Sequence, residues 1–150
     1  MNQTAMLTRF VRECGLDCLL VAGRYTLLDQ SAADELLPAC AQHGVGVLAG
    51  GVYNSGILAD PRPGATYDYA PADPSTLARA RAIAEVCKSY GVPLRAAAVQ
   101  FPLRHPAVSA VVVGARSPAE VDDAVRAFEH EIPPALWTAL HDERLLRRTE

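Results

Sequence analysis

Only three stretches of this chain look like buried β-strands, and that number constrains the fold more than any other feature. Residues 16–22, 45–49 and 108–113 are short apolar runs without polar alternation, as is typical of parallel strands covered on both faces. Helical patterns separate them, which predicts right-handed crossovers and a parallel sheet in an α/β fold. Three parallel strands leave two open sheet edges. We therefore expect part of a larger architecture.

Helical periodicity fills most of the remaining sequence, and its ends carry residues that favour helix termini. The longest pattern begins at Asp73 and Pro74, a capping residue followed by proline at the first helical position. Pro38 lies inside another pattern and should kink that helix or delay its start. Residues 50–72 read mostly as loop. The expected helices cover residues 4–14, 31–43, 74–90, 94–101, a segment starting at 118, and 133–147, and the expected N-caps are Thr4, Ser31, Asp73 and Ser117.

Size and charge narrow the class of protein. The chain has 150 residues, 50% hydrophobic and 21% charged, which predicts one globular domain over 1–150. Its net charge of −3 argues against nucleic acid or an anionic membrane as a partner, because both need a basic surface. No signal peptide or apolar run of ~20 residues is present. The four cysteines and four histidines lack zinc-ligand spacing, so we expect no metal site and a cytoplasmic protein with reduced thiols.

A glycine-rich segment follows the second apolar run. Residues 50–56 contain three glycines, Gly50, Gly51 and Gly56. Glycine permits close backbone approach and unusual dihedral angles, so the amide groups of such a loop can converge on a phosphate. By itself the segment is also compatible with an ordinary flexible turn.

A second candidate segment follows the third apolar run. Gly114 to Ser117 leads into a helix that Ser117 and Pro118 begin, and a helix N-terminus with free amides attracts phosphate. Arg116 is the cation available there for a phosphate or for stacking on a base. The alternative for Arg116 is a solvated surface charge, the commonest use of arginine.

Three stretches in this order and spacing resemble one family, the aldo/keto reductases. They are residues 22–30, 50–58 and 112–121, and they resemble strands six, seven and eight of the family barrel with the turns that follow them. The nearest branch is that of L-fucose (D-threo-aldose) dehydrogenase and pyridoxal 4-dehydrogenase. The resemblance implies an α/β fold that is a partial (β/α)8 TIM barrel: strands six to eight with their helices and a C-terminal helix. The family binds its ligands at the carboxyl ends of the strands.

The resemblance also implies a dinucleotide cofactor, NAD or NADP, and residues that bind it. Asn2 matches a residue that bonds the nicotinamide carboxamide, and Asp123 falls where an acid accepts from the adenine amino group. Glu120 occupies a region where NADP-specific relatives often carry a second cation, which favours NAD. Arg24 and Tyr25 could line the substrate side, although Tyr25 is more simply read as core packing. The implied cofactor-binding residues are Asn2, Gly50, Gly51, Tyr53, Asn54, Ser55, Gly56, Gly114, Ala115, Arg116, Ser117, Glu120 and Asp123.

Family chemistry is hydride transfer with a Tyr, Lys, Asp and His set that lies in the first half of the barrel, and this chain does not match that half. Its only lysine, Lys88, is expected on an outer helix, and Tyr53 has no lysine near it. An ordinary tyrosine, with a pKa near 10, is a poor base at neutral pH. Two hypotheses follow. The chain is the cofactor-binding half of an NAD(P)-dependent oxidoreductase, inactive alone and completed by an N-terminal half-barrel, or it is a non-enzymatic nucleotide-binding or self-associating half-barrel.

Overall fold

A three-stranded parallel sheet organises the chain. The computed structural model describes residues 2–147. Strand β2 (Gly46–Gly50) lies between β1 (Cys18–Ala22) and β5 (Val108–Val112), and both pairs are parallel. In register, Leu20 pairs with Leu48 and Gly50 with Val112. The prediction of a parallel α/β sheet is confirmed.

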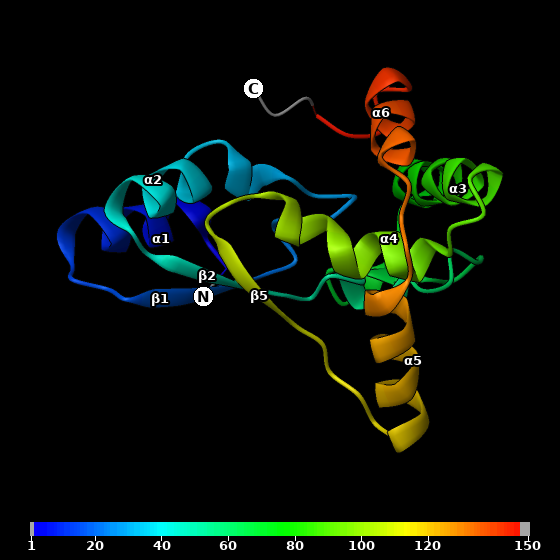
Figure 1. Ribbon diagram of the computed structural model, residues 1–150, viewed down its shortest axis with the longest axis horizontal. Coiled ribbons are helices and arrows are strands. Elements are labelled where there is room, and N and C mark those ends of the chain that lie inside the picture. Colours follow the sequence, from blue (N-terminus) through cyan, green and yellow to red (C-terminus); the bar gives the residue numbers. More distant parts are fainter. Residues whose placement is uncertain (1, 148–150) are drawn as a thin grey trace.

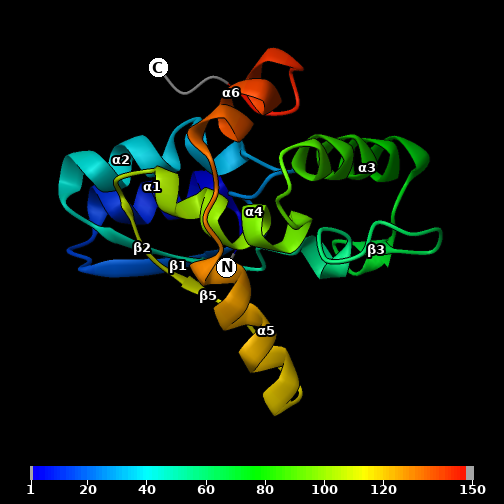
Figure 2. The ribbon, with the colours of Figure 1, turned by 45° about the vertical axis from the view of Figure 1, so that its right-hand side comes forward.

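The helices lie mainly on one face of this sheet. In both views α1, α2 and α4 sit above the strands, while α5 projects from the end of the sheet on the other side (Figures 1 and 2). Helix α3 packs against α4 and α6, away from the strands. The helix bounds are α1 (Thr4–Glu13), α2 (Leu36–His43), α3 (Pro74–Ser89), α4 (Leu94–Gln100), α5 (Pro118–Glu129) and α6 (Pro134–Asp142).

The two faces of the sheet differ in burial, and here the expectation of strands covered on both faces is wrong. Side chains alternate between the faces of a strand. Leu19 and Val21 of β1 are buried beneath the helices, whereas Leu20 between them is 46% exposed. Val112 on β5 is 44% exposed on the same side as Leu20. One face of the sheet is therefore apolar and uncovered.

Local chemistry sets several helix ends as predicted. The Asp73 side chain accepts from the backbone N–H groups of Ser75 and Thr76 at 2.9 Å each and starts α3. Ser117 caps α5, and Gly44 ends α2 with φ +68°. The prediction that Thr4 caps the first helix is wrong, because Gln3 holds that position.

At the start of α1, Gln3 holds the N-cap position, and the Thr4 carbonyl accepts from the Thr8 hydroxyl within the helix. At residues 31–43 the chain first forms a 3₁₀ turn over Ser31–Ala33, and Ser31 makes no side-chain cap. Pro38 is the third residue of α2, so the proline delays the helix start. The last helix is shorter than expected and ends at Asp142.

The long connection between β2 and α3 is more ordered than the expected loop. It contains a 3₁₀ turn (Asn54–Gly56) and a small antiparallel hairpin of β3 (Thr66–Tyr67) and β4 (Ala70–Pro71). The Ser55 carbonyl accepts from the Thr66 hydroxyl at 3.0 Å, and the Ser55 hydroxyl accepts from the Tyr69 N–H at 3.2 Å. The hairpin is thereby tied to the turn.

Between the sheet and the outer helices lies an apolar core with an aromatic cluster. Tyr25 and Phe101 have ring centroids 5.1 Å apart, and Trp137 lies 6.2 Å from Phe101. The Arg104 guanidinium stands 4.6 Å from the centre of the Trp137 ring, a cation–π contact. Across residues 2–147, no helix has the length and apolarity that crossing a membrane requires.

Candidate functional site

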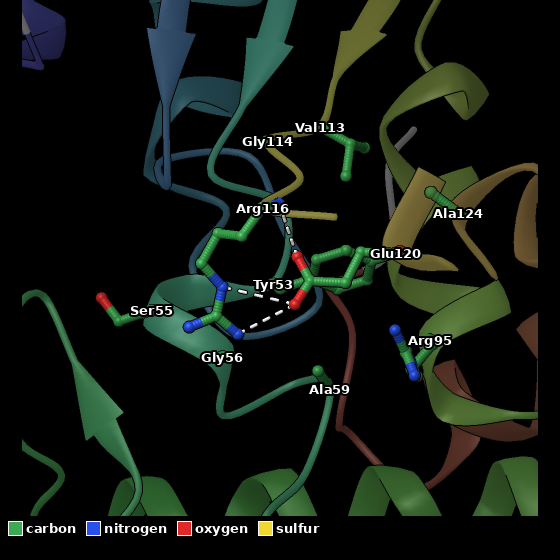
Figure 3. A pocket seen from close by; sticks show the side chains of 10 residues that line it. All are labelled: Tyr53, Ser55, Gly56, Ala59, Arg95, Val113, Gly114, Arg116, Glu120 and Ala124. Atoms are coloured by element: carbon green, nitrogen blue, oxygen red, sulfur yellow. Dashed lines mark hydrogen bonds and ion pairs between the residues drawn. The ribbon is translucent and has the colours of Figure 1, made fainter. Parts of the chain in front are cut away.

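A pocket of about 430 Å³ opens beyond the carboxyl ends of β2 and β5. Figure 3 shows the strands entering this region from the top, with Glu120 and Ala124 of α5 on the right. A volume of this order is typical of small-molecule sites. Its lining comes from the loop after β2, the loop after β5, and helices α4 and α5. The lining residues are Tyr53, Ser55, Gly56, Ala59, Arg95, Val113, Gly114, Arg116, Glu120 and Ala124.

The loop after β2 has an unusual backbone. Asn54, Ser55 and Gly56 take φ angles of 45°, 58° and 99° in succession, a left-handed conformation that costs a residue with a Cβ about 1–2 kcal/mol. Buried contacts hold it: Asn54 is 3% exposed, and its Nδ2 donates to the Gly23 carbonyl at 3.3 Å. Strain maintained at a pocket wall is common at functional sites. The Ser55 hydroxyl, already an acceptor, keeps its own proton to donate.

Gly51 brings the loops after β1 and β2 together. Its φ is +61°, and a Cβ at this position would lie 3.0 Å from the Gly23 nitrogen. The Gly23 N–H donates to the Gly50 carbonyl at 2.9 Å, which extends the β1–β2 pairing into the loops. Glycine is therefore required at position 51 for conformation and for space.

The start of α5 forms the opposite wall. The Ser117 side chain accepts from the Glu120 N–H at 3.3 Å, and the Glu120 carboxylate accepts from the Arg116 backbone N–H at 2.7 Å and from its Nη2 at 2.9 Å. These hydrogen bonds raise the pKa of Arg116 and lower that of Glu120. The Arg116 side chain is 91% exposed, so the pair lies on the rim of the pocket.

Arg95 is a lining residue that the sequence analysis missed. It is the second residue of α4 and forms an ion pair with Asp123 of α5. The nearby Tyr53 hydroxyl is buried and accepts a hydrogen bond from the Arg95 guanidinium. The sequence favoured NAD because Glu120 stands on α5 where a second cation was sought, and Arg95 brings a cation to the pocket from α4 instead. Its place at the start of a helix was the available signal, because helix starts in β/α units lie on the same side as strand carboxyl ends.

The structure brings only some of the predicted cofactor residues to the pocket. Six line it: Tyr53, Ser55, Gly56, Gly114, Arg116 and Glu120. The pocket lining does not include Asn54, Gly51, Gly50, Ser117 or Asp123. Ala115 lines a separate apolar groove of about 250 Å³ together with Val121, Val125 and Phe128 of α5.

The three remaining predicted residues are Asn2, which contacts the end of β1, and Arg24 and Tyr25, which follow this strand. Asn2 lies beside the end of this strand, where its Oδ1 accepts from the Ala22 N–H at 3.0 Å. The Arg24 guanidinium donates to Asp29 at 3.1 Å and to Asp68 at 2.8 Å, so it links this loop to the β3–β4 hairpin. Tyr25 is 4% exposed, which places it in the core and not in a substrate cavity.

The pocket is suited to an anion and poorly suited to proton transfer. The residues present fit a phosphate group, because they offer two guanidinium groups, the Ser55 hydroxyl and open backbone before Gly56 and Gly114. Burial raises the pKa of Tyr53 above its ordinary value, so even less of the phenolate that could act as a base is present at neutral pH. Lys88 is in the last turn of α3. Within residues 2–147 no three potential His, Cys, Asp or Glu ligands cluster as a metal site.

Parallel strands backed by helices, with a pocket at the strands' carboxyl ends, are the arrangement of ligand-binding α/β folds, the β/α barrel among them. The chain belongs to the Aldo/keto reductase family, whose sequence profile matches residues 3–142. It is 45% identical over 146 residues to pyridoxal 4-dehydrogenase of Microbacterium luteolum, covering 97% of this chain and 43% of that protein. It is 46% identical over 142 residues to D-threo-aldose 1-dehydrogenase of a Pseudomonas species, covering 93% and 43%.

The solved structures agree with the family assignment at the level of fold. An aldo-keto reductase of Bacillus halodurans in its apo form superposes with a TM-score of 0.70 at 22% identity, covering 98% of this chain and 49% of that one. Its holo form gives 0.69. The chain thus spans less than half the length of the curated relatives and about half of the solved barrel.

Proposed function

We propose that this chain is the cofactor-binding half of an oxidoreductase, that it binds NAD at the pocket beyond β2 and β5, and that these strands with β1 correspond to strands six to eight of the family barrel. One observation supports this most: the strained Asn54–Gly56 turn and the N-terminus of α5 face each other across one pocket. Both features favour phosphate oxygens. A bound nicotinamide would supply the hydride chemistry.

The residues divide the cofactor between them in this proposal. Ser55, Gly56 and the backbone of the turn hold the pyrophosphate, while Arg116 and the start of α5 hold the adenosine end. Asn2 and the neighbouring turns lie toward the nicotinamide. The substrate class, an aldose or alcohol oxidised or a related aldehyde reduced, is what the resemblance to aldo/keto reductases implies, and the two relatives are a pyridoxal and a D-threo-aldose dehydrogenase. Because no lysine stands beside a tyrosine in the pocket, we infer that the proton-transferring groups come from outside this chain, which is inactive alone.

Cofactor binding can be tested on the purified chain. NADH is titrated and its fluorescence followed, with circular dichroism to show that each variant is folded. We expect saturable binding that a Ser55→Ala/Arg116→Ala double variant weakens by about tenfold or more, since each side chain contributes a hydrogen bond to charged oxygens. Arg126→Ala, which removes a cation from the exposed far end of α5, should bind as the wild type does. No saturation at millimolar NADH with folded protein would refute the proposal.

A completing half-barrel is the second element of the proposal, and the exposed apolar surfaces favour it. Besides Leu20 and Val112 on the uncovered face, α5 carries a stripe of Val121, Val125 and Phe128, each about half exposed. Met6 and Phe10 are exposed on α1, at the other edge of the sheet. Apolar side chains at both edges and on one face are what further β/α units would cover.

The same surfaces are compatible with the alternative of a self-associating, non-enzymatic half-barrel. Sedimentation can distinguish the two hypotheses. It is measured on the chain alone and on the chain mixed with a polypeptide that carries the first half of a relative's barrel. A stable 1:1 complex that gains NAD-dependent dehydrogenase activity supports the completed enzyme. A homodimer that dissociates in a Leu20→Glu/Val112→Glu variant, with no complex on mixing, supports self-association.

A further inference from the structure

We propose that Arg95 is a second anion-binding residue of the pocket, and that Asp123, by holding it, sets the preference for the dinucleotide without a 2′-phosphate. The inference rests on the proposed function, since it concerns which form of the cofactor the pocket selects. It assigns a role to a residue that the sequence analysis did not single out.

Arg95 has more hydrogen-bond donors than its two protein partners use. Its Nη2 is paired with Asp123, and the Tyr53 hydroxyl accepts a hydrogen bond from its guanidinium. A guanidinium carries five N–H donors in a planar fork that suits phosphate oxygens. Asp123 is not part of the pocket lining, whereas Arg95 is. Arg95 thus forms part of the pocket wall, and the carboxylate paired with it does not.

The pocket's charges are balanced in two pairs, Arg116 with Glu120 and Arg95 with Asp123. A 2′-phosphate brings a charge of roughly −1.5 to −2 and must draw a guanidinium away from its carboxylate to be neutralised. A ribose 2′-hydroxyl instead donates to a carboxylate, as acidic residues do in NAD-specific sites. Balanced pairs therefore favour NAD, even though two cations are present.

The two pairs differ in how firmly they hold their arginine. The Arg116 side chain is 91% exposed, and such pairs are weak and readily opened. The Arg95 and Asp123 side chains are 40% and 34% exposed and join two packed helices, α4 and α5. Release of Arg95 therefore requires removal of the Asp123 charge, and that substitution should change nucleotide preference most.

The test compares the dissociation constants of NADPH and NADH for four forms of the 150-residue chain. Asp123→Asn should improve NADPH binding relative to NADH by roughly tenfold, the value of one charge-assisted hydrogen bond. The matched control is Asp122→Asn, which removes the same charge one residue away on an exposed side of α5 and should change the ratio by less than about twofold. An Arg95→Gln/Asp123→Asn double variant should return the ratio to that of the wild type.

An Asp123→Asn ratio equal to the wild-type ratio, or a gain that persists without Arg95, would overturn the inference and leave NAD binding standing. If the Arg95–Asp123 ion pair serves only to join α4 to α5, Asp123→Asn should leave the ratio at the wild-type value and lower the stability of the chain. If none of the four folded proteins binds either nucleotide, the proposed function falls and this inference falls with it.

Discussion

Replacing Gly51 with alanine tests the close approach of the two loops beneath the pocket. Two effects add there. A left-handed φ of +61° costs an alanine about 1–2 kcal/mol. The new methyl group would also lie 3.0 Å from the Gly23 nitrogen, and overpacking of this kind costs about 1–3 kcal/mol. We expect Gly51→Ala to lower the free energy of unfolding by about 2–5 kcal/mol.

Two other glycines separate these contributions. Gly44 has nearly the same φ, +68°, with nothing within 4 Å of an added Cβ, so Gly44→Ala should show the strain alone, about 1–2 kcal/mol. Gly15 has neither a positive φ nor a close neighbour, and Gly15→Ala should be close to neutral. Urea unfolding followed by circular dichroism measures all three. If Gly51→Ala costs no more than Gly44→Ala, the Gly23 contact does not constrain this position and the reasoning is wrong.

Two further predictions concern charge and burial. Burial opposes ionisation of Asp29, but hydrogen bonds from Ser31 and Arg24 outweigh it and lower its pKa. The ionised Asp29 side chain should therefore stabilise the fold fully above its pKa in the unfolded chain, about 3.9, and this stabilisation should be lost as the pH falls through its lower pKa in the folded chain. Urea unfolding at a series of pH values measures this, and Arg24→Ala should reduce the pH dependence of the free energy of unfolding. An unchanged profile in that variant would contradict the prediction. Burial raises the pKa of Cys87 to about 11, so at pH 8 a thiol reagent should label two cysteines of the native chain and four in denaturant. The exposed pair is Cys14 and Cys18, and the buried pair is Cys40 and Cys87.

The parts of the fold that could be predicted from the sequence are set by interactions between residues close together in the chain. Asp73 before Pro74 and Ser117 before Pro118 begin helices with bonds to amides two or three residues away, and Gly44 ends one with its own backbone angle. Such signals act within one turn of helix and can be recognised without the rest of the molecule. The order of strands and helices followed from apolar runs of the right length.

What the sequence could not reveal depends on contacts between distant segments. The apolar run around Leu20 gives the same pattern whether or not the second face of its strand is covered, since composition alone does not say what lies opposite. Arg95 and Asp123 are 28 positions apart, and only the packing of α4 on α5 pairs them. The resemblance pointed to the glycine-rich turn and the start of α5. Tyr25 lies in the core although it is close to a strand end, because burying an aromatic ring contributes more than exposing it there.

Because of the β3–β4 hairpin, some positions in the long connection between β2 and α3 should accept inserted or deleted residues and others should not. Surface loops commonly accept inserted or deleted residues. Here Thr66 and Tyr69 are bonded to Ser55, and Asp68 to Arg24, so one extra residue between 66 and 69 would change the spacing between these attachments. A residue added near Gly64, where no side chain crowds the backbone, would leave them in place. Among homologues, length variation should therefore fall before the hairpin and spare the hairpin itself.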